Sequence, residues 1–418
     1  MSVHRTVETV ETGGCSIDVC RIDGPQSREL FFHCRPPAAI ADAGRQAEAL
    51  YRAILTMTEG VGGGLCSVVA ETLFLRDLRS DVESVRAARR RVLAAGAATR
   101  ESAATVIEQP PLNADARVEV LAQAVMPTSP SAHRDSIVAR RETGTGESAQ
   151  ARGLRLRLGN ETHLHAGDIR VAGSNAYEQA LGMFLLAEDL LRAAGMTFGD
   201  VVRTWIYLRD IDRDYDDLNR ARRTFFETRG IDPVPASTGI GAGPASAAHD
   251  LCMSIHAARA GDALPRTVMT SPTLNEATDY GADFVRGMRV REGGLDRLFV
   301  SGTASIDEYG RTAHPGDIDA QADRMLVNVA ALLERQGAAF GDVVSAVTYL
   351  KHPADADRLR KKLRDAGFAG FPHALVVAPI CRADLLCETE ALAIIEAGKR
   401  SGSDLRRPVT EAVTGDSA

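Results

Sequence analysis

The chain has 418 residues, of which 44% are hydrophobic and 25% charged, a composition typical of globular proteins and long enough for several domains. Its net charge of −7 offers no basic surface for nucleic acid, so we expect a small molecule as partner. Seven scattered cysteines without a CxxC pair favour reduced thiols, and the absence of an apolar leader or of a run of about 20 apolar residues predicts a cytoplasmic protein without membrane contact.

Strands and helices are predicted to alternate in the first module, residues 1–127. Apolar runs and helical periodicity indicate a strand at 29–34, a helix at 42–60, a strand at 67–75, an arginine-rich helix at 81–95 and a strand at 117–125. The next segment, 128–153, is rich in small and charged residues and lacks apolar periodicity, which predicts a flexible linker. The same composition predicts a disordered tail at 399–418.

The same order of elements recurs twice more. A second module, 154–264, is expected to contain strands in 154–173, a helix at 176–194, a strand at 201–208, a helix at 215–229 and a strand at 250–257. A third module, 265–398, is expected to contain a strand at 297–301, a helix at 318–336, a strand at 343–350, a helix at 354–366 and a strand at 384–394.

A register of identical residues supports this threefold division. The first set holds a glutamine, a valine 23 residues later and a leucine six residues after that: Gln46, Val69 and Leu75; Gln179, Val202 and Leu208; Gln321, Val344 and Leu350. The second set holds an aspartate and, seven residues later, an alanine: Asp115 and Ala122; Asp250 and Ala257; Asp384 and Ala391. A repeat of about 130 residues indicates tandem globular modules, because solenoid repeats are far shorter.

Each module should be an α+β unit with its helices on one face of a sheet and the other face in need of cover. In a chain of three such units, each sheet can cover the next. We therefore expect a pseudo-threefold ring with clefts where neighbouring modules meet, where ligand pockets commonly lie. A closed ring predicts a monomer, with a weak homo-oligomer as the alternative.

The densest group of polar residues lies in the segment 380–390. On a regular strand, Arg382, Asp384, Glu388 and Glu390 would share one face. An arginine can clamp a carboxylate, and a carboxyl group in a dry cleft can hold its proton near neutral pH and act as an acid. A solvated ladder of ion pairs is the alternative. The other modules lack the pair formed by Arg382 and Glu388 at the matching positions: Asn113 and Glu119, Ala248 and Ser254.

Several other residues are candidates for binding a substrate. Ser301 and Thr303 flank Gly302 after an apolar strand, where hydroxyl and backbone N–H groups can bind a carboxylate. Tyr280 and Arg286 either line a pocket or close a β-hairpin. Among the arginines near residue 222, Arg222 either belongs to a solvated basic face or binds an anionic substrate. Asp317 suits a helix N-cap, and His314 suits a loop.

Two sets of motifs make the chain resemble a known superfamily. The segment 193–202, Ala-Ala-Gly-Met-Thr-Phe-Gly-Asp-Val-Val, leading into 205–208, Trp-Ile-Tyr-Leu, resembles the YjgF/Rid superfamily. Modules 2 and 3 are most similar to its chorismatases, on four matching segments: 301–306, 314–321, 352–355 and 380–388. The resemblance implies three tandem Rid-like modules with the chorismate-mutase-like fold, arranged as an intramolecular pseudo-trimer with sites between modules.

The resemblance also implies a reaction. Chorismatases hydrolyse the enolpyruvyl ether of chorismate in secondary metabolism, and Glu388 falls on the glutamate that protonates the enolpyruvyl methylene. Arg382 falls on the substrate-binding arginine, and Cys381 belongs to the same motif. The implied protein is a cofactor-independent hydrolase or lyase that acts on a small anionic substrate, chorismate or a related carboxylated enol ether, and uses no metal.

Two departures from the family patterns leave alternatives open. The arginine of the Pro-Ala-Arg segment in Rid imine deaminases is replaced here by Ser237 and Ala374, which disfavours standard imine deamination. The tyrosine of a chorismatase Leu-Glu-Arg-Tyr-Arg segment is replaced by Ala221, and a third module is added. An enamine or imine hydrolase, an imine-cyclising or condensing enzyme, and a non-catalytic ligand-binding scaffold are the alternative hypotheses.

Overall fold

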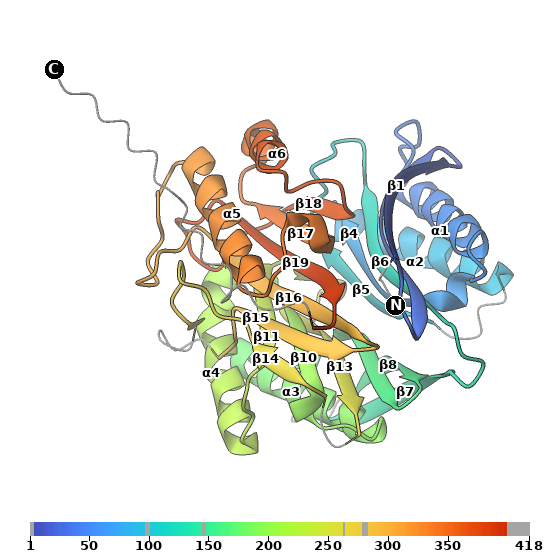
Figure 1. The fold of residues 1–418 in the computed structure, drawn as a ribbon, viewed down its shortest axis with the longest axis horizontal. Coiled ribbons are helices and arrows are strands. Elements are labelled where there is room, and N and C mark those ends of the chain that lie inside the picture. Colours follow the sequence, from blue (N-terminus) through green and yellow to red (C-terminus); the bar gives the residue numbers. More distant parts are fainter. Residues whose placement is uncertain (1–3, 97–100, 144–147, 262–263, 278–282, 399–418) are drawn as a thin grey trace.

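The computed structural model describes residues 4–96, 101–143, 148–261, 264–277 and 283–398. Three sheets meet in the middle of the molecule, and a pair of helices lies outside each sheet (Figure 1). The pairs are α1 with α2, α3 with α4, and α5 with α6. The predicted α+β fold of three modules in a pseudo-threefold ring is therefore confirmed.

Each module runs through the same series of elements. Module 1 contains β1 (His4–Thr12), β2 (Cys15–Asp23), β3 (Ser27–Arg35), α1 (Ala43–Glu59), β4 (Val68–Leu75), α2 (Leu78–Ala95), β5 (Ala103–Glu108) and β6 (Val118–Pro127). Module 2 contains β7 (His133–Glu142), β8 (Ser148–Leu158), β9 (Glu161–Ile169), α3 (Ala176–Ala193), β10 (Val201–Leu208), α4 (Ile211–Arg229), β11 (Ala236–Gly241), β12 (Gly243–Pro244) and β13 (Leu251–Ala260). Module 3 contains β14 (Arg266–Val268), β15 (Gly287–Glu292), β16 (Leu295–Ala304), α5 (Ile318–Glu334), β17 (Val343–Leu350), α6 (Ala356–Asp365), β18 (His373–Val377) and β19 (Cys387–Glu396).

The three sheets have one topology. Their strand orders are β1-β2-β3-β6-β4-β5, β7-β8-β9-β13-β10-β11 and β14-β15-β16-β19-β17-β18, and β12 of module 2 extends the first sheet beyond β5. One pair in each sheet is parallel, namely β4 with β5, β10 with β11 and β17 with β18. A helix makes the crossover between these strands, because a parallel connection must return over the sheet.

The predicted linker at 128–153 is wrong for most of its described residues. β7 and the first part of β8 lie there and form the outer hairpin of the second sheet. β7 alternates between buried Ile137 and Ala139 and exposed Val138 and Arg140, so one of its faces packs while the other is polar. The alternation is short and flanked by charge, which hid the strand. The predicted tail at 399–418 lies outside the described residues.

The repeated glutamines have one structural role. Each lies in the first turns of the first helix of its module and binds the loop before the last strand through its side-chain amide. Gln46 donates to the carbonyl of Asp115 (2.9 Å), and Gln321 to the carbonyl of Asp384 (2.8 Å). Gln179 instead reaches the Asp250 carboxylate (3.1 Å). The glutamine and the aspartate are thus repeated because they meet across each module.

The repeated valines explain how the modules hold together. Val69 packs against residues of β8, Val202 against residues of β15 and β16, and Val344 against residues of β2 and β3. The first cluster joins modules 1 and 2, the second joins modules 2 and 3, and the third closes the ring between modules 3 and 1. Burying apolar side chains between the sheets provides the cover that each one needs.

Local sequence sets the helix starts. An aspartate or asparagine side chain accepts a backbone N–H at the start of five helices: Asp42, Asp77, Asn175, Asp210 and Asp317. Such caps satisfy N–H groups that the first turn leaves unpaired. The N-cap role predicted for Asp317 is confirmed. No helix among the described residues has the length and apolar character needed to span a bilayer.

Candidate active site between modules 2 and 3

A cavity of about 280 Å³ lies where α4 and β11 of module 2 face β16 and the start of β19 of module 3. Five of the predicted site residues line it: Arg222, Arg286, Cys381, Arg382 and Glu388. Residues 380–388 come from the end of the chain, whereas Arg222 comes from α4, so the closed ring brings them together. The cavity is close to the lower size limit of pockets that hold small molecules.

Glu388 is the acidic group of this cavity. It is 4% exposed, on β19, where it pairs with Tyr349 on one side and Ala304 on the other. Burial and the neighbouring Glu390 raise the pKa of Glu388 to about 8, although Arg203 and Arg286 act in the opposite direction. The carboxyl group therefore holds a proton at neutral pH and can donate it to a bound molecule.

Gly302 makes room for this carboxyl group. A Cβ atom at residue 302 would come closer to Oε1 of Glu388 than real Cβ atoms come to other atoms, and it would make a tight contact of 3.0 Å with Cγ2 of Thr238. The backbone N–H of Gly302 donates to Oγ1 of Thr238 (2.9 Å). The glycine in the Ser301–Thr303 segment is needed for this close approach of β16 to Glu388 and β11.

Three arginines supply positive charge to the same cavity. The guanidinium groups of Arg222 and Arg286 both lie against the ring of Phe284, with their carbons 5.4 and 5.7 Å from its centre. Arg286 also donates to the backbone carbonyl of Asn275 (2.9 Å), and Arg222 to Oδ1 of Asn219 (2.8 Å). Bonds that hold the guanidinium groups in place reduce the entropy lost when a carboxylate binds.

Arg382 does not lie on the strand that the sequence predicts. β19 begins only at Cys387, and Arg382 and Asp384 lie in the turn before it. The prediction that both share a strand face with Glu388 is therefore wrong. Arg382 still lines the cavity, and its Nη1 donates to the carbonyl of Gly310 (2.7 Å). Asp384 is exposed and accepts a hydrogen bond from Thr312 (3.0 Å).

The remaining predicted residues divide into two groups. Burial raises the pKa of Cys381 to about 12, so its thiol is neutral and a poor nucleophile. Ser301 and Thr303 are fully buried behind the wall of the cavity, where Ser301 donates to the Val285 carbonyl (2.6 Å) and Thr303 to the Ser301 carbonyl (2.9 Å). Neither residue lines the cavity, and both hydroxyls donate to backbone carbonyls, so their predicted contact with substrate stays a prediction. Tyr280 lies outside the described residues.

Sequence analysis missed several residues that line the cavity. Tyr215 and Asn219 lie on α4 in line with Arg222, at spacings of four and three residues that place all three on one helix face. That spacing is a signal that could have identified them. Thr238 on β11 could not be found in this way, because the short strand within 236–241 was not predicted.

The corresponding positions in the other two clefts differ from Glu388. Ser254 lies between modules 2 and 1, hydrogen-bonds Thr105 (2.6 Å) and, with it, lines a central cavity of about 150 Å³. Glu119, of module 1, is held by His33 (2.8 Å), and both are almost completely buried. Within the described residues, the pattern of an acid with three arginines thus occurs at the cleft between modules 2 and 3.

Glu390, two residues beyond Glu388, belongs to a different cavity. It faces a central cavity of about 150 Å³ between the three sheets, together with Arg203, Trp205 and Tyr349. Arg203 pairs with its Oε2 (2.7 Å), and Nε1 of Trp205 donates to its Oε1 (2.8 Å). Trp205 therefore packs at an interface between modules, and Glu390 forms an internal ion pair.

Comparisons with known proteins agree with this architecture. Residues 279–395 match the family model of endoribonuclease L-PSP. A chorismatase from Streptomyces rapamycinicus is 32% identical over 231 residues, which span 49% of this chain and 66% of that protein. A 3-hydroxybenzoate synthase from Streptomyces hygroscopicus is 28% identical over 55% of this chain and 75% of that protein.

Two further matches place the chain in a family. A RutC family protein from Pyrococcus abyssi is 34% identical over 24% of this chain and 79% of that protein. A chorismatase crystal structure aligns with a TM-score of 0.57 and 21% identity, covering 78% of this chain and 93% of that one, and so shares the fold. These relatives support a chorismatase-like enzyme. The chain belongs to the YjgF/Rid superfamily, and its second and third modules are chorismatase-like.

Proposed function

We propose that this protein cleaves the enolpyruvyl ether of chorismate, or of a closely related carboxylated enol ether, with Glu388 as the general acid. The observation that carries the proposal is a buried carboxyl group with a pKa of about 8 in a cavity lined by three arginines. An enol ether needs a strong enough acid beside its methylene carbon, and a dicarboxylate needs cationic partners. The similarity to a chorismatase supports this choice of substrate class.

The first step transfers the proton of Glu388 to the methylene carbon of the enolpyruvyl group. The carbon attached to the ether oxygen becomes an oxocarbenium ion, and the new Glu388 carboxylate stabilises its positive charge. Water adds to that carbon and forms a hemiketal. The hemiketal collapses to pyruvate and the free alcohol, and a proton returns to Glu388, so that one water is consumed for each ether cleaved.

The arginines are assigned to the substrate carboxylates. Arg222, on α4 of module 2, and Arg286, of module 3, both lie against the ring of Phe284, whereas Arg382 approaches from the turn before β19. Clamps from two directions would fix the enolpyruvyl methylene next to Glu388, and such positioning contributes strongly to rate. Removing a charge-assisted hydrogen bond costs about 1.5–3 kcal/mol, so Arg382→Ala should raise KM by roughly 10- to 100-fold.

The similarity to a 3-hydroxybenzoate synthase favours a second product. Chorismate less pyruvate has the composition of a hydroxybenzoate, so loss of pyruvate without addition of water would give an aromatic acid. Glu388 would donate its proton in the same first step. The two reactions share pyruvate and differ in the absorbance and mass of the ring product.

The test incubates purified protein with chorismate and follows pyruvate through lactate dehydrogenase, with the ring product separated by chromatography. We expect pyruvate from wild type and a loss of about 10² to 10⁴ in rate for Glu388→Gln, which should still bind chorismate. Asp384→Asn is the matched control, because this exposed carboxylate lies four residues away and does not line the cavity. We expect Asp384→Asn to keep its rate.

Two outcomes would count against the proposal. No pyruvate from wild type would reject the enolpyruvyl ether and leave imines or enamines as the substrates to test in the same cavity. A normal rate for Glu388→Gln would reject the acid. Binding of chorismate without any turnover would support the alternative of a ligand-binding scaffold.

A further inference from the structure

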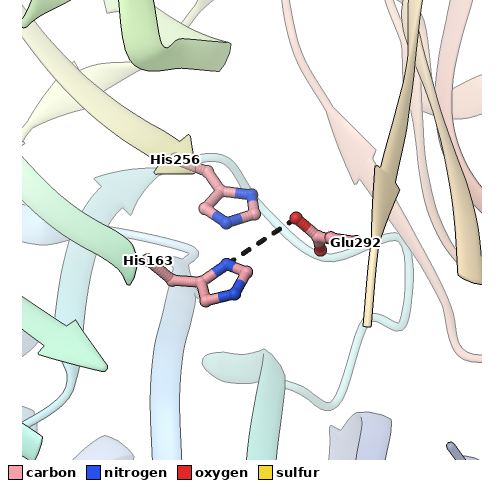
Figure 2. Close-up of side chains that lie close together, drawn as sticks. All are labelled: His163, His256 and Glu292. Atoms are coloured by element: carbon pink, nitrogen blue, oxygen red, sulfur yellow. Dashed lines mark ion pairs between the residues drawn. The ribbon is translucent and has the colours of Figure 1, made fainter. Parts of the chain in front are cut away.

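A second group of reactive side chains lies away from the cavity that holds Glu388. His163 and His256 come from β9 and β13 of module 2, and Glu292 from the end of β15 in module 3 (Figure 2). One potential ligand atom from each lies within 4.8 Å of the others. All three residues are buried, with exposed fractions of 6%, 6% and 2%.

The buried polar atoms of this group are not satisfied by the protein. Nε2 of His163, Nε2 of His256 and Oε2 of Glu292 have no hydrogen-bond partner among the described residues. A buried polar atom without a hydrogen-bond partner lowers the stability of the folded state, so each such atom needs an explanation. Nδ1 of His163 lies 3.7 Å from Oε2 of Glu292, and the two groups form an ion pair when the histidine is protonated (Figure 2). A bound cation would satisfy Nε2 of His256 and Oε2 of Glu292 together, whereas Nε2 of His163 faces Glu161.

The surroundings carry excess negative charge. Glu29, Glu161 and Glu292 are buried around a single guanidinium, that of Arg297, which contacts both Glu29 and Glu292. Burial acts to raise the pKa of Glu29, but Arg297 and its hydrogen bonds hold the pKa below its usual range. Three buried carboxyl groups thus surround one buried guanidinium, an excess of acidic groups that a bound cation would offset.

The neighbouring groups resemble the outer shell of a metal site. Oε2 of Glu161 lies 3.5 Å from Nε2 of His163, which would orient the ring and leave Nδ1 for a metal. Arg297 holds Oε1 of Glu292 and leaves Oε2 available. A small cavity of about 10 Å³, lined by Glu161, His163 and Glu292, adjoins the group and has the size of one water molecule or ion.

We propose that His163, His256 and Glu292 bind a divalent transition-metal ion, with Zn²⁺ as the first candidate. Two imidazoles and one carboxylate are a common Zn²⁺ ligand set and leave a fourth position for water. Ligand atoms around Zn²⁺ stand roughly 3.4 Å apart for bonds of about 2.1 Å, so binding would draw these three atoms closer than the 4.8 Å within which they now lie.

The ion would have a structural role. It would join two strands of module 2 to module 3, while the Arg297 ion pair with Glu29 links the same place to module 1. None of the three ligands lines the cavity that holds Glu388, so the site stands apart from the proposed reaction. Its occupancy should raise the Tm of the whole ring, because an ion that binds only the folded state stabilises it.

The test strips the full chain with a chelator, adds Zn²⁺ alone and measures bound zinc by equilibrium dialysis and mass spectrometry. We expect one Zn²⁺ per wild-type chain and a rise in Tm, with both lost in His256→Gln and Glu292→Gln. His165→Gln is the matched control, because His165 stacks on His256 at 4.3 Å but is not one of the three ligands. It should keep its zinc.

The proposal is overturned if the stripped wild type takes up no Zn²⁺, if the two ligand variants keep it, or if the control loses it as well. Because a buried substitution can prevent folding, a second measurement uses only wild type. Loaded with Co²⁺, it should show paramagnetically shifted proton signals from two imidazole rings. Shifted signals from no histidine, or from histidines other than His163 and His256, would equally overturn the proposal.

Discussion

Replacing Glu388 by glutamine should stabilise the folded protein, although it removes the proposed acid. Glutamine has nearly the shape of a protonated glutamate but cannot ionise. The folded-state pKa of about 8 lies above the ordinary value of 4.5, so the wild type binds one more proton when folded than when unfolded between these limits. Its stability is therefore full below pH 4.5 and is lost progressively as the pH rises to about 8.

The size of the effect follows from the pKa difference. One pKa unit corresponds to about 1.4 kcal/mol. Relative to its stability at low pH, the wild type should therefore lose about 1 kcal/mol of unfolding free energy by pH 5, about 3 by pH 7 and about 5 by pH 9 through this group alone. Glu388→Gln lacks this loss. Its stability relative to wild type should therefore increase by about 4 kcal/mol between pH 5 and pH 9.

The assay is urea unfolding of both proteins across this pH range. Glu390→Gln is a contrasting variant and not a silent control, because Glu390 itself raises the pKa of Glu388; its carboxylate lies two residues away on the same strand and pairs with Arg203, which is 2% exposed. Removing that partner leaves a buried cation and should destabilise the protein by about 3–5 kcal/mol. A stability difference between Glu388→Gln and wild type that is constant with pH would mean that Glu388 is ionised at neutral pH, and would refute the reasoning.

Other predictions test the ring and the cavity. Gly302→Ala should keep the fold, but its rate of pyruvate release should fall by a factor of about 10² or more, because the new methyl group displaces Glu388. A normal rate would contradict this geometry. Gln321→Leu and Gln179→Leu should each lower the free energy of unfolding in urea by about 2–5 kcal/mol, because the hydrogen-bond partners of the glutamine are left unpaired. Only Gln321→Leu should raise KM, because it loosens the turn that carries Arg382. Light scattering should give the mass of one chain, whereas a trimer of chains would argue against a ring closed within the molecule.

Much of the fold could be predicted from the sequence. The strands predicted at 201–208 and 343–350 have the observed bounds, and the helices predicted at 176–194 and 318–336 are each within two residues of α3 and α5. These elements are long and strongly periodic. The parallel strands β5, β11 and β18 were missed, because they have only five or six residues and their stability comes from pairing with β4, β10 and β17.

The candidate site was predicted in part. Glu388 and Arg382 stood out because the other two repeats lack them together, and five predicted residues do line one cavity. The strand face expected to carry Arg382 does not exist, since the chain turns before Cys387. Nothing in the local sequence indicates that the hydroxyl groups of Ser301 and Thr303 donate hydrogen bonds to backbone carbonyls.

The sequence by itself determined the threefold repeat, the type and order of the main elements, and the residues on which the superfamily resemblance rests. Local propensity, periodicity and the repeated register are properties of neighbouring residues and can be read along the chain. Only the tertiary structure decided that Glu388 is dry enough to keep its proton, that Glu390 pairs with Arg203, and that His163, His256 and Glu292 converge. Burial and charge proximity depend on which distant strands meet when the ring closes, and no local pattern encodes those distances.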